Sequence, residues 1–237
     1  MIDYLYNPKF WEWGWELRLI SQKTGLLTLV VALLIPNFKV KVYRRILAFT
    51  VFSLLMEHVS TDEDLSHLFI DTSNAPWYHL LTPILFLLMT RFFTDYLMDG
   101  QYRWWLPLAF SIICIFNAID EEWGDGFYNF PSLPVGIYSL TGMTLVVNYF
   151  IYTLRSLEFE YLEREPMFWV SSGWLIYMAG SFLLWVSIRF MAYDNDFFFS
   201  IYRVNMVVTM LLNGAFIIAL VLINDKHKIE EEVVPEI

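Results

Sequence analysis

Three ionisable side chains near the ends of two neighbouring apolar stretches are the residues best suited to chemistry in this sequence. Glu57 and His58 end the stretch 43–59, and His79 lies at the start of the stretch 77–97. A carboxylate and two imidazoles around one point would bind Zn²⁺ and polarise a water molecule. Adjacent residues on a helix, however, point about 100° apart. A hydrogen-bonding or proton-sensing role between helices is therefore a second interpretation, and ordinary helix packing is a third.

A stripe of small polar residues runs along the last apolar stretch. Asn205, Thr209 and Asn213 are spaced four residues apart, which places them on one face of a helix. Such a stripe typically hydrogen-bonds a neighbouring membrane helix. It would alternatively form one wall of a polar cavity that faces Asn148 in another stretch.

The stretch 167–191 combines small and aromatic residues. Gly173 and Gly180 indicate that another helix approaches closely, because small residues allow backbones to come together in membranes. Trp174 and Tyr177 lie between them. These rings either pack against other helices or line a pocket for a ligand.

Several familiar sites are missing from the sequence. The core of the stretch 202–223 has no lysine for a retinal Schiff base, and it has no histidine of the kind expected in seven-helix zinc hydrolases. No glycine-rich phosphate loop and no Gly-x-Ser-x-Gly nucleophile motif occurs. No cofactor is therefore predicted, and the lack of a basic face argues against binding of nucleic acid.

The elements that would position these residues are membrane helices. The chain of 237 residues is 57% hydrophobic and 19% aromatic. A membrane helix needs roughly 20 mostly apolar residues. The sequence predicts a single all-α domain, a polytopic integral membrane protein with seven transmembrane helices at about 16–35, 43–59, 77–97, 104–118, 135–154, 167–191 and 202–223, followed by a short charged cytoplasmic tail at 224–237.

The basic residues predict how the helices are oriented. Lys39, Lys41, Arg44 and Arg45 crowd the turn after the first stretch, whereas the connections on the opposite side, at 60–76, 120–134 and 192–201, contain no Lys or Arg. Basic residues in short loops stay on the cytoplasmic side. We therefore expect an N-terminus outside, a C-terminus inside, and a multi-pass location in the bacterial inner membrane.

Two short runs resemble a known group of proteins. Asn74-Ala-Pro-Trp-Tyr-His-Leu-Leu-Thr-Pro83 and Pro166-Met-Phe-Trp-Val-Ser-Ser-Gly-Trp-Leu-Ile-Tyr177 resemble uncharacterised bacterial seven-helix proteins that are similar to membrane regions associated with sensor histidine kinases. The resemblance implies a sensory or accessory role. Because the chain has no kinase domain, signalling would pass through a partner.

Three classes of function follow from these observations. The leading hypothesis is a non-enzymatic membrane sensor or accessory subunit, which detects a ligand, a lipid or a proton and acts through a membrane or cytoplasmic protein partner. The alternative is a small transporter or channel. A metal-dependent hydrolase in the membrane, with zinc at Glu57, His58 and His79, is the third.

Overall fold

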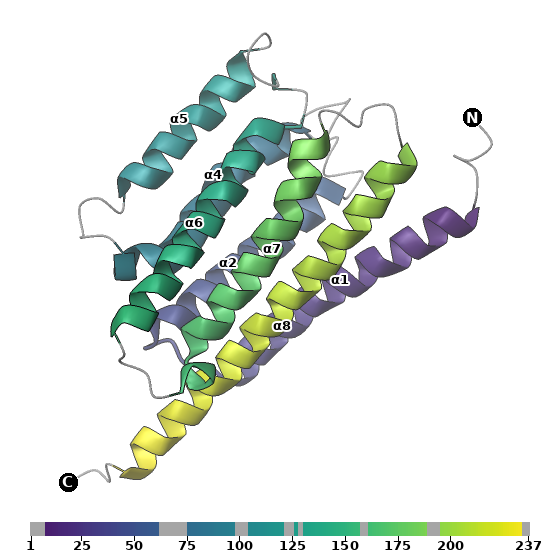
Figure 1. Cartoon of the computed structure of the whole chain (residues 1–237). Helices are drawn as coiled ribbons and strands as arrows, with labels where there is room; N and C mark the ends of the chain where they lie inside the picture. Colours follow the sequence, from purple (N-terminus) through teal and green to yellow (C-terminus); the bar gives the residue numbers. More distant parts are fainter. Residues whose placement is uncertain are drawn as a thin grey trace.

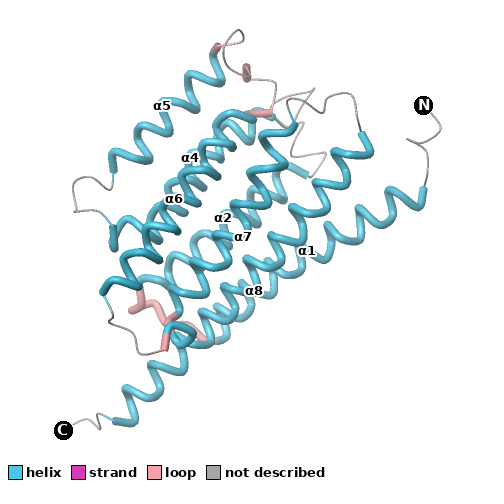
Figure 2. The backbone as a smooth tube through the Cα atoms, in the orientation of Figure 1, coloured by secondary structure: helices cyan, strands magenta, loops and turns pink. Residues whose placement is uncertain are grey.

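The computed structural model describes residues 8–61, 75–97, 104–120, 126–127, 130–156, 161–188 and 195–233. Within these ranges the chain forms seven α-helices, one short 3₁₀ helix and no strand (Figure 1, Figure 2). The elements are α1 (Pro8–Leu34), α2 (Lys41–Thr61), α4 (Ala75–Leu97), α5 (Trp105–Ile119), α6 (Ser132–Ser156), η2 (Leu162–Arg164), α7 (Pro166–Ile188) and α8 (Asn195–Val233).

Six of these helices form a closed ring. The order of neighbours around it is α1, α2, α4, α6, α7 and α8, and α8 packs against α1 to close it. Helix α5 lies outside the ring against α4 and α6 (Figure 1). We call the end of the bundle where α1 begins the N-side and the opposite end the C-side. The ring helices therefore follow one another in sequence order, and α5 is left out of the ring.

Five helices in the described part of the chain are long and apolar enough to cross a membrane. The spans are Glu16–Leu34, Pro76–Leu97, Ser132–Ser156, Pro166–Leu184 and Arg203–Asp225. Helix α5 is apolar but has 15 residues, a length of about 22 Å, which is shorter than the roughly 30 Å of a hydrocarbon core. Helix α2 begins with basic residues and contains Glu57 near its end. The helices indicate a multi-pass membrane protein.

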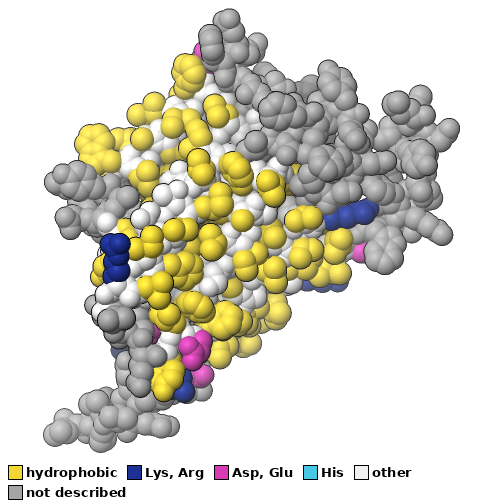
Figure 3. Space-filling view, viewed as in Figure 1, with side chains coloured by type: hydrophobic (Ala, Val, Ile, Leu, Met, Phe, Trp, Pro, Cys, Tyr) yellow, Lys and Arg dark blue, Asp and Glu magenta, His cyan; other side chains and the backbone are white. Residues whose placement is uncertain are grey.

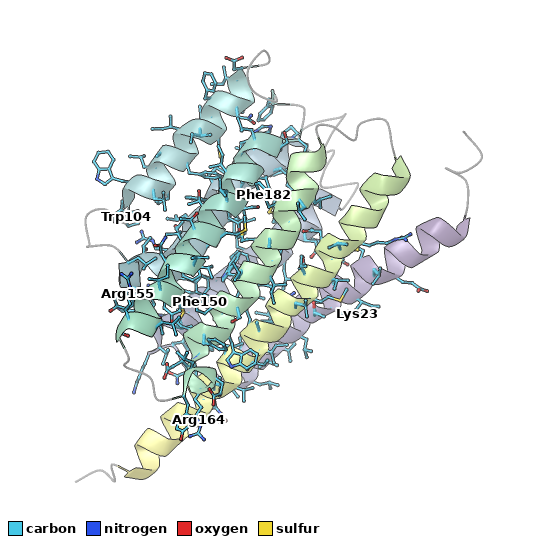
Figure 4. All side chains as sticks on the ribbon, viewed as in Figure 1. Lys23, Trp104, Phe150, Arg155, Arg164 and Phe182 are labelled. Carbon is cyan, nitrogen blue, oxygen red and sulfur yellow. The ribbon has the colours of Figure 1, made fainter. Side chains whose placement is uncertain are left out.

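The surface agrees with this class. Large hydrophobic side chains such as Leu34, Trp105 and Ile119 are more than half exposed on the bundle. Hydrophobic side chains spread across the middle of the face in Figure 3, while Lys, Arg, Asp and Glu gather toward its edges. Soluble monomers rarely expose such continuous apolar areas. Arg155 and Arg164 lie at the C-side end (Figure 4).

Two helices are longer than the sequence predicts. Helix α1 begins at Pro8 rather than near residue 16, and α8 continues to Val233 instead of ending near residue 223. The stretch after Ile223 is charged but contains no Gly or Pro before Pro235. Lys and Glu are good helix formers, so α8 extends beyond the apolar span. A proline disfavours helix at the residue before it, which agrees with the end of α8 close to Pro235.

Helices α7 and α8 meet along two glycines. A Cβ added at Gly173 would lie 2.7 Å from the Cβ of Ala215, and one added at Gly180 would lie 2.8 Å from Cγ1 of Val208. Carbon atoms normally remain about 3.5–4.0 Å apart. The small residues therefore allow the close approach that the sequence indicated.

Three contacts fix the C-side of the bundle. The hydroxyl of Tyr43 donates to the carbonyl of Ala32 at 2.7 Å, where α1 ends and carbonyls lack helical partners. Arg45 of α2 donates to the carboxylate of Asp95 in α4, and Lys41 lies 4.0 Å from the same oxygen. These contacts hold α2 against both of its neighbours.

Candidate functional site

A cavity of about 180 Å³ lies inside the ring, in its N-side half. All six ring helices contribute to its wall, together with Phe130 from the segment before α6. The remaining lining residues are Arg18, Ser21, Ser53, Met56, Glu57, Tyr78, Thr82, Leu85, Val135, Tyr138, Tyr177, Asn205, Met206 and Thr209. A ligand that contacts every helix can bias the arrangement of the whole bundle.

Among the described residues, the wall contains one positive and one negative side chain. Arg18 projects from α1, and Glu57 projects from the adjacent α2. The carboxylate of Glu57 interacts electrostatically with Arg18 and accepts a side-chain hydrogen bond from Gln22. Charged groups inside a bundle are expensive unless they are paired. The electrostatic interaction with Arg18 and the hydrogen bond from Gln22 therefore offset part of the cost of placing a carboxylate at the cavity.

Three tyrosines approach this pair from the other side of the ring. Tyr177 of α7 lies near enough to interact electrostatically with Tyr78 of α4 and with Glu57, and Tyr138 of α6 interacts with Tyr177 in the same way. Tyr177 also forms a side-chain hydrogen bond with Ser181. Phenol hydroxyls both donate and accept hydrogen bonds. The tyrosines thus add adaptable polar groups beside the two charges.

Helix α8 supplies the last polar wall. The hydroxyl of Ser181 donates to Oδ1 of Asn205 at 2.7 Å, which joins α7 to α8. The hydroxyl of Thr209 donates to the carbonyl of Asn205 at 2.8 Å. The side-chain oxygen of Asn205 is therefore engaged, whereas its amide nitrogen makes no hydrogen bond to the described residues and is available to a ligand.

Two further residues on the wall carry hydroxyls that have no partner within the described part of the chain. Tyr138 and Ser21 are each only 6% exposed, and both line the cavity. Neither hydroxyl forms a hydrogen bond with the described part of the chain. Buried polar groups in folded proteins usually have a partner. These hydroxyls give the cavity hydrogen-bonding capacity that the described residues do not use.

Four buried rings pack together inside the ring on the C-side of the cavity, and we call them the aromatic floor. They are Phe49 of α2, Phe92 of α4, Trp174 of α7 and Phe216 of α8. The ring centre of Trp174 lies 4.8 Å from that of Phe49 and 6.1 Å from those of Phe92 and Phe216. Phe216 lies two helical turns, about 10 Å, beyond Thr209. The floor therefore separates the cavity from the C-side.

The structure brings together four of the residues selected from the sequence. Glu57, Tyr177, Asn205 and Thr209 all line the cavity, and Trp174 belongs to its floor. Three different helices provide them. The polar stripe on α8 and the aromatic residues of α7 are thus parts of one site.

The two histidines lie elsewhere. His58 is exposed on α2, whereas His79 is buried on α4 with its ring stacked 5.9 Å from that of Phe127. Neither lines the cavity. In the described part of the chain, no three His, Cys, Asp or Glu side chains lie close enough together to hold a metal ion. Glu57 faces the cavity without either imidazole.

The remaining two asparagines have different surroundings. Nδ2 of Asn213 donates to the hydroxyl of Thr24 at 3.1 Å and so joins α8 to α1. Asn148 is exposed on α6, where its Nδ2 donates to the carbonyl of Thr144 at 2.8 Å. Asn213 therefore connects helices, and Asn148 does not face the stripe on α8 across the cavity.

Sequence reasoning missed Arg18, Tyr78 and Tyr138. Arg18 carried a usable signal, because a charged residue inside a predicted span calls for an opposite charge, and Glu57 supplies one. The tyrosines carried none, since the chain has 14 of them. Nothing in the local sequence separates tyrosines that face the cavity from those that face lipid.

Comparisons with known proteins give no match: no protein-family model, no curated protein and no solved structure is significantly similar to the chain. Its function must therefore be argued from the site itself.

Proposed function

We propose that the chain is a non-enzymatic membrane sensor or accessory subunit that binds a small ligand in the ring cavity and acts through a protein partner. The observation that carries the proposal is a polar cavity shared by six helices, with the packed rings of the aromatic floor on its C-side. A layer of packed rings on one side of the cavity favours binding of a ligand over its passage through the bundle. Among the described residues, no second carboxylate and no histidine lines the cavity with Glu57, which favours binding over catalysis.

The proposal includes an orientation and a number of spans. The N-side and its cavity face the outside, and all seven α-helices lie in the cytoplasmic membrane, including the short α5 and the more polar α2. Support comes from the basic residues, because Lys39, Lys41, Arg44, Arg155 and Arg164 all lie near the C-side. Ligands from outside would then reach the cavity from its N-side.

Helix α8 provides a route from the cavity to a partner. It has 39 residues and a length of about 58 Å, so it extends past the C-side of the bundle (Figure 1). Asn205 and Thr209 lie in its cavity half. A ligand that favours one of two positions of α8 would move the extension on the opposite side, where a cytoplasmic partner would detect it.

A variant that fills the cavity tests this function. Thr209→Phe places a ring in the cavity, and Val207→Phe places the same ring on an exposed position of the same helix. Protein isolated from its native membrane is analysed by native mass spectrometry for bound small molecules. We expect Thr209→Phe to lose the ligand and Val207→Phe to retain it. Removal of residues 226–237 should release the partner while leaving the ligand in place.

A transporter is the second candidate, and the position of the cavity is the observation that favours it. Carriers often bind their substrates among helices near the middle of the membrane. The molecule found by mass spectrometry is therefore offered in labelled form to proteoliposomes that contain the wild-type chain. Uptake that Thr209→Phe abolishes would replace the sensor with a carrier, whereas binding without uptake supports the sensor.

A further inference from the structure

The inner face of α7 carries a column of side chains with polar atoms. Its members are Ser171, Trp174, Tyr177 and Ser181. Because a helix has 3.6 residues per turn, this spacing places them one above another on a single face. The ring of Trp174 lies 4.8 Å from that of Phe49 across the bundle, so this face points into the ring of helices.

The two members of the column on the N-side have partners for their polar atoms. Tyr177 and Ser181 share a side-chain hydrogen bond, and Ser181 donates to Oδ1 of Asn205 at 2.7 Å. Tyr177 and Asn205 both line the cavity. This half of the column therefore belongs to the site already described.

The two members on the C-side are buried without partners. Trp174 and Ser171 are each 0% exposed, and neither Nε1 of Trp174 nor the hydroxyl oxygen of Ser171 has a hydrogen-bond partner within the described residues. An indole N–H only donates, whereas a hydroxyl both donates and accepts. Buried polar groups in folded proteins usually bond either to the protein or to an ordered water molecule. The two atoms therefore indicate a place where a water molecule binds.

The geometry of α7 brings these two side chains within reach of one water molecule. Cβ atoms three residues apart on a helix are about 5–6 Å from each other. Aromatic side chains on a helix lean toward its N-terminus, so the indole of Trp174 leans toward Ser171. A water molecule with hydrogen bonds of about 2.8 Å bridges polar atoms that lie about 4–6 Å apart. One water molecule is therefore enough to join the two groups.

We infer that a buried water molecule binds on the C-side of the aromatic floor, where it accepts from the indole N–H of Trp174 and bonds to the hydroxyl of Ser171. Buried waters typically make two to four hydrogen bonds, and these groups supply two of them. The ring of Trp174 contacts the other three rings of the floor, so the water molecule fixes the orientation of the ring at its centre. The inference does not depend on a ligand in the cavity.

NMR of the indole N–H groups tests the inference on the purified full-length chain, with isotope-labelled tryptophan and in nanodiscs. We expect magnetisation to pass from water to the N–H of Trp174, and its chemical shift to be that of a hydrogen-bonded indole. Trp169 on the same helix is the reference for a bonded indole, because its Nε1 donates to the carbonyl of Glu163 at 2.8 Å. Trp174→Phe identifies the signal by removing it. A wild-type Trp174 signal with no transfer from water, or with the shift of an unbonded indole, would overturn the inference.

Two neighbouring serines test the second partner of the water molecule. Ser171→Ala removes the hydroxyl that should bond to the water, whereas Ser172→Ala removes a hydroxyl that donates to the carbonyl of Phe168 at 2.8 Å. We expect Ser171→Ala to shift the Trp174 signal and to weaken the transfer from water, and Ser172→Ala to leave both unchanged. Equal effects of the two variants, or no effect of Ser171→Ala, would overturn the bridge to Ser171. The measurement on the wild-type chain requires no variant to fold.

Discussion

The contact between α7 and α8 gives the sharpest test of the fold, through the substitution Gly173→Ala. The new Cβ would lie 2.7 Å from that of Ala215 and 3.5 Å from Cα of Leu212. Two carbons need about 3.5 Å or more, so the helices must separate by about 1 Å. Overpacking of this kind costs about 1–3 kcal/mol, whereas alanine gains about 0.5–1 kcal/mol over glycine within a helix. We expect a net destabilisation of about 1–2 kcal/mol.

Two further variants separate the clash from other effects. Gly214 has no atom within 4 Å of the position its Cβ would take, so Gly214→Ala keeps the helical gain and should be neutral or stabilising by up to about 1 kcal/mol. In Gly173→Ala/Ala215→Gly the closest contact would be Cδ1 of Leu212 at 3.3 Å, the end of a flexible side chain. The pair should show a favourable coupling energy of about 1 kcal/mol or more.

The assay is reversible unfolding of the purified variants in mixed micelles, with the free energy of unfolding measured for all four combinations at positions 173 and 215. Coupling below about 0.3 kcal/mol would mean that the two positions behave independently. That result, or a loss of stability in Gly214→Ala equal to that in Gly173→Ala, would refute the close packing of α7 on α8.

Three more predictions concern single contacts. Tyr43→Phe leaves the buried carbonyl of Ala32 without its partner and should lower the free energy of unfolding by about 1–3 kcal/mol in the same assay; an unchanged value would mean that α1 ends differently. Asn213→Leu should cost on the order of 1 kcal/mol through the loss of its bond to Thr24. Among the described residues the side chain of Asn148 bonds only within its own helix, so Asn148→Leu should be nearly neutral, and the reverse ranking would contradict the positions of the two residues. Asp95→Asn removes the charge that Arg45 contacts and should lower stability by up to about 1 kcal/mol. The loss should be smaller at 1 M salt than at 0.1 M, because salt screens charges, and thermal unfolding at the two salt concentrations measures it. A loss that salt does not alter would argue against an electrostatic origin.

The helical class of the chain could be predicted from the sequence because hydropathy is a local property. Long runs of apolar residues form helices in a membrane, where each backbone polar group must bond within its own segment. Five of the predicted stretches correspond to helices that are long and apolar enough to span. The extension of α8 to Val233 was not predicted, because a charged segment continues a helix by its propensity and not by its hydropathy.

Part of the candidate site could also be predicted from the sequence. The four-residue spacing of Asn205, Thr209 and Asn213 fixed a common face, and Glu57 was selected because a charge within an apolar stretch needs a partner. The predicted grouping of Glu57 with His58 and His79 had weaker support in the sequence than the common face of the stripe. Adjacent residues diverge around a helix, and in the structure Glu57 faces the cavity while His58 is exposed.

The sequence by itself determined which apolar stretches form helices and which polar residues they carry. Only the tertiary structure decided that Arg18 lies near enough to Glu57 to interact electrostatically, that Tyr138 and Tyr177 face the same space as Asn205, and that the aromatic floor packs on the C-side of this space. The reason is that periodicity fixes which residues of one helix share a face. The order of the helices around the ring and the rotation of each about its axis depend on how all the side chains pack together.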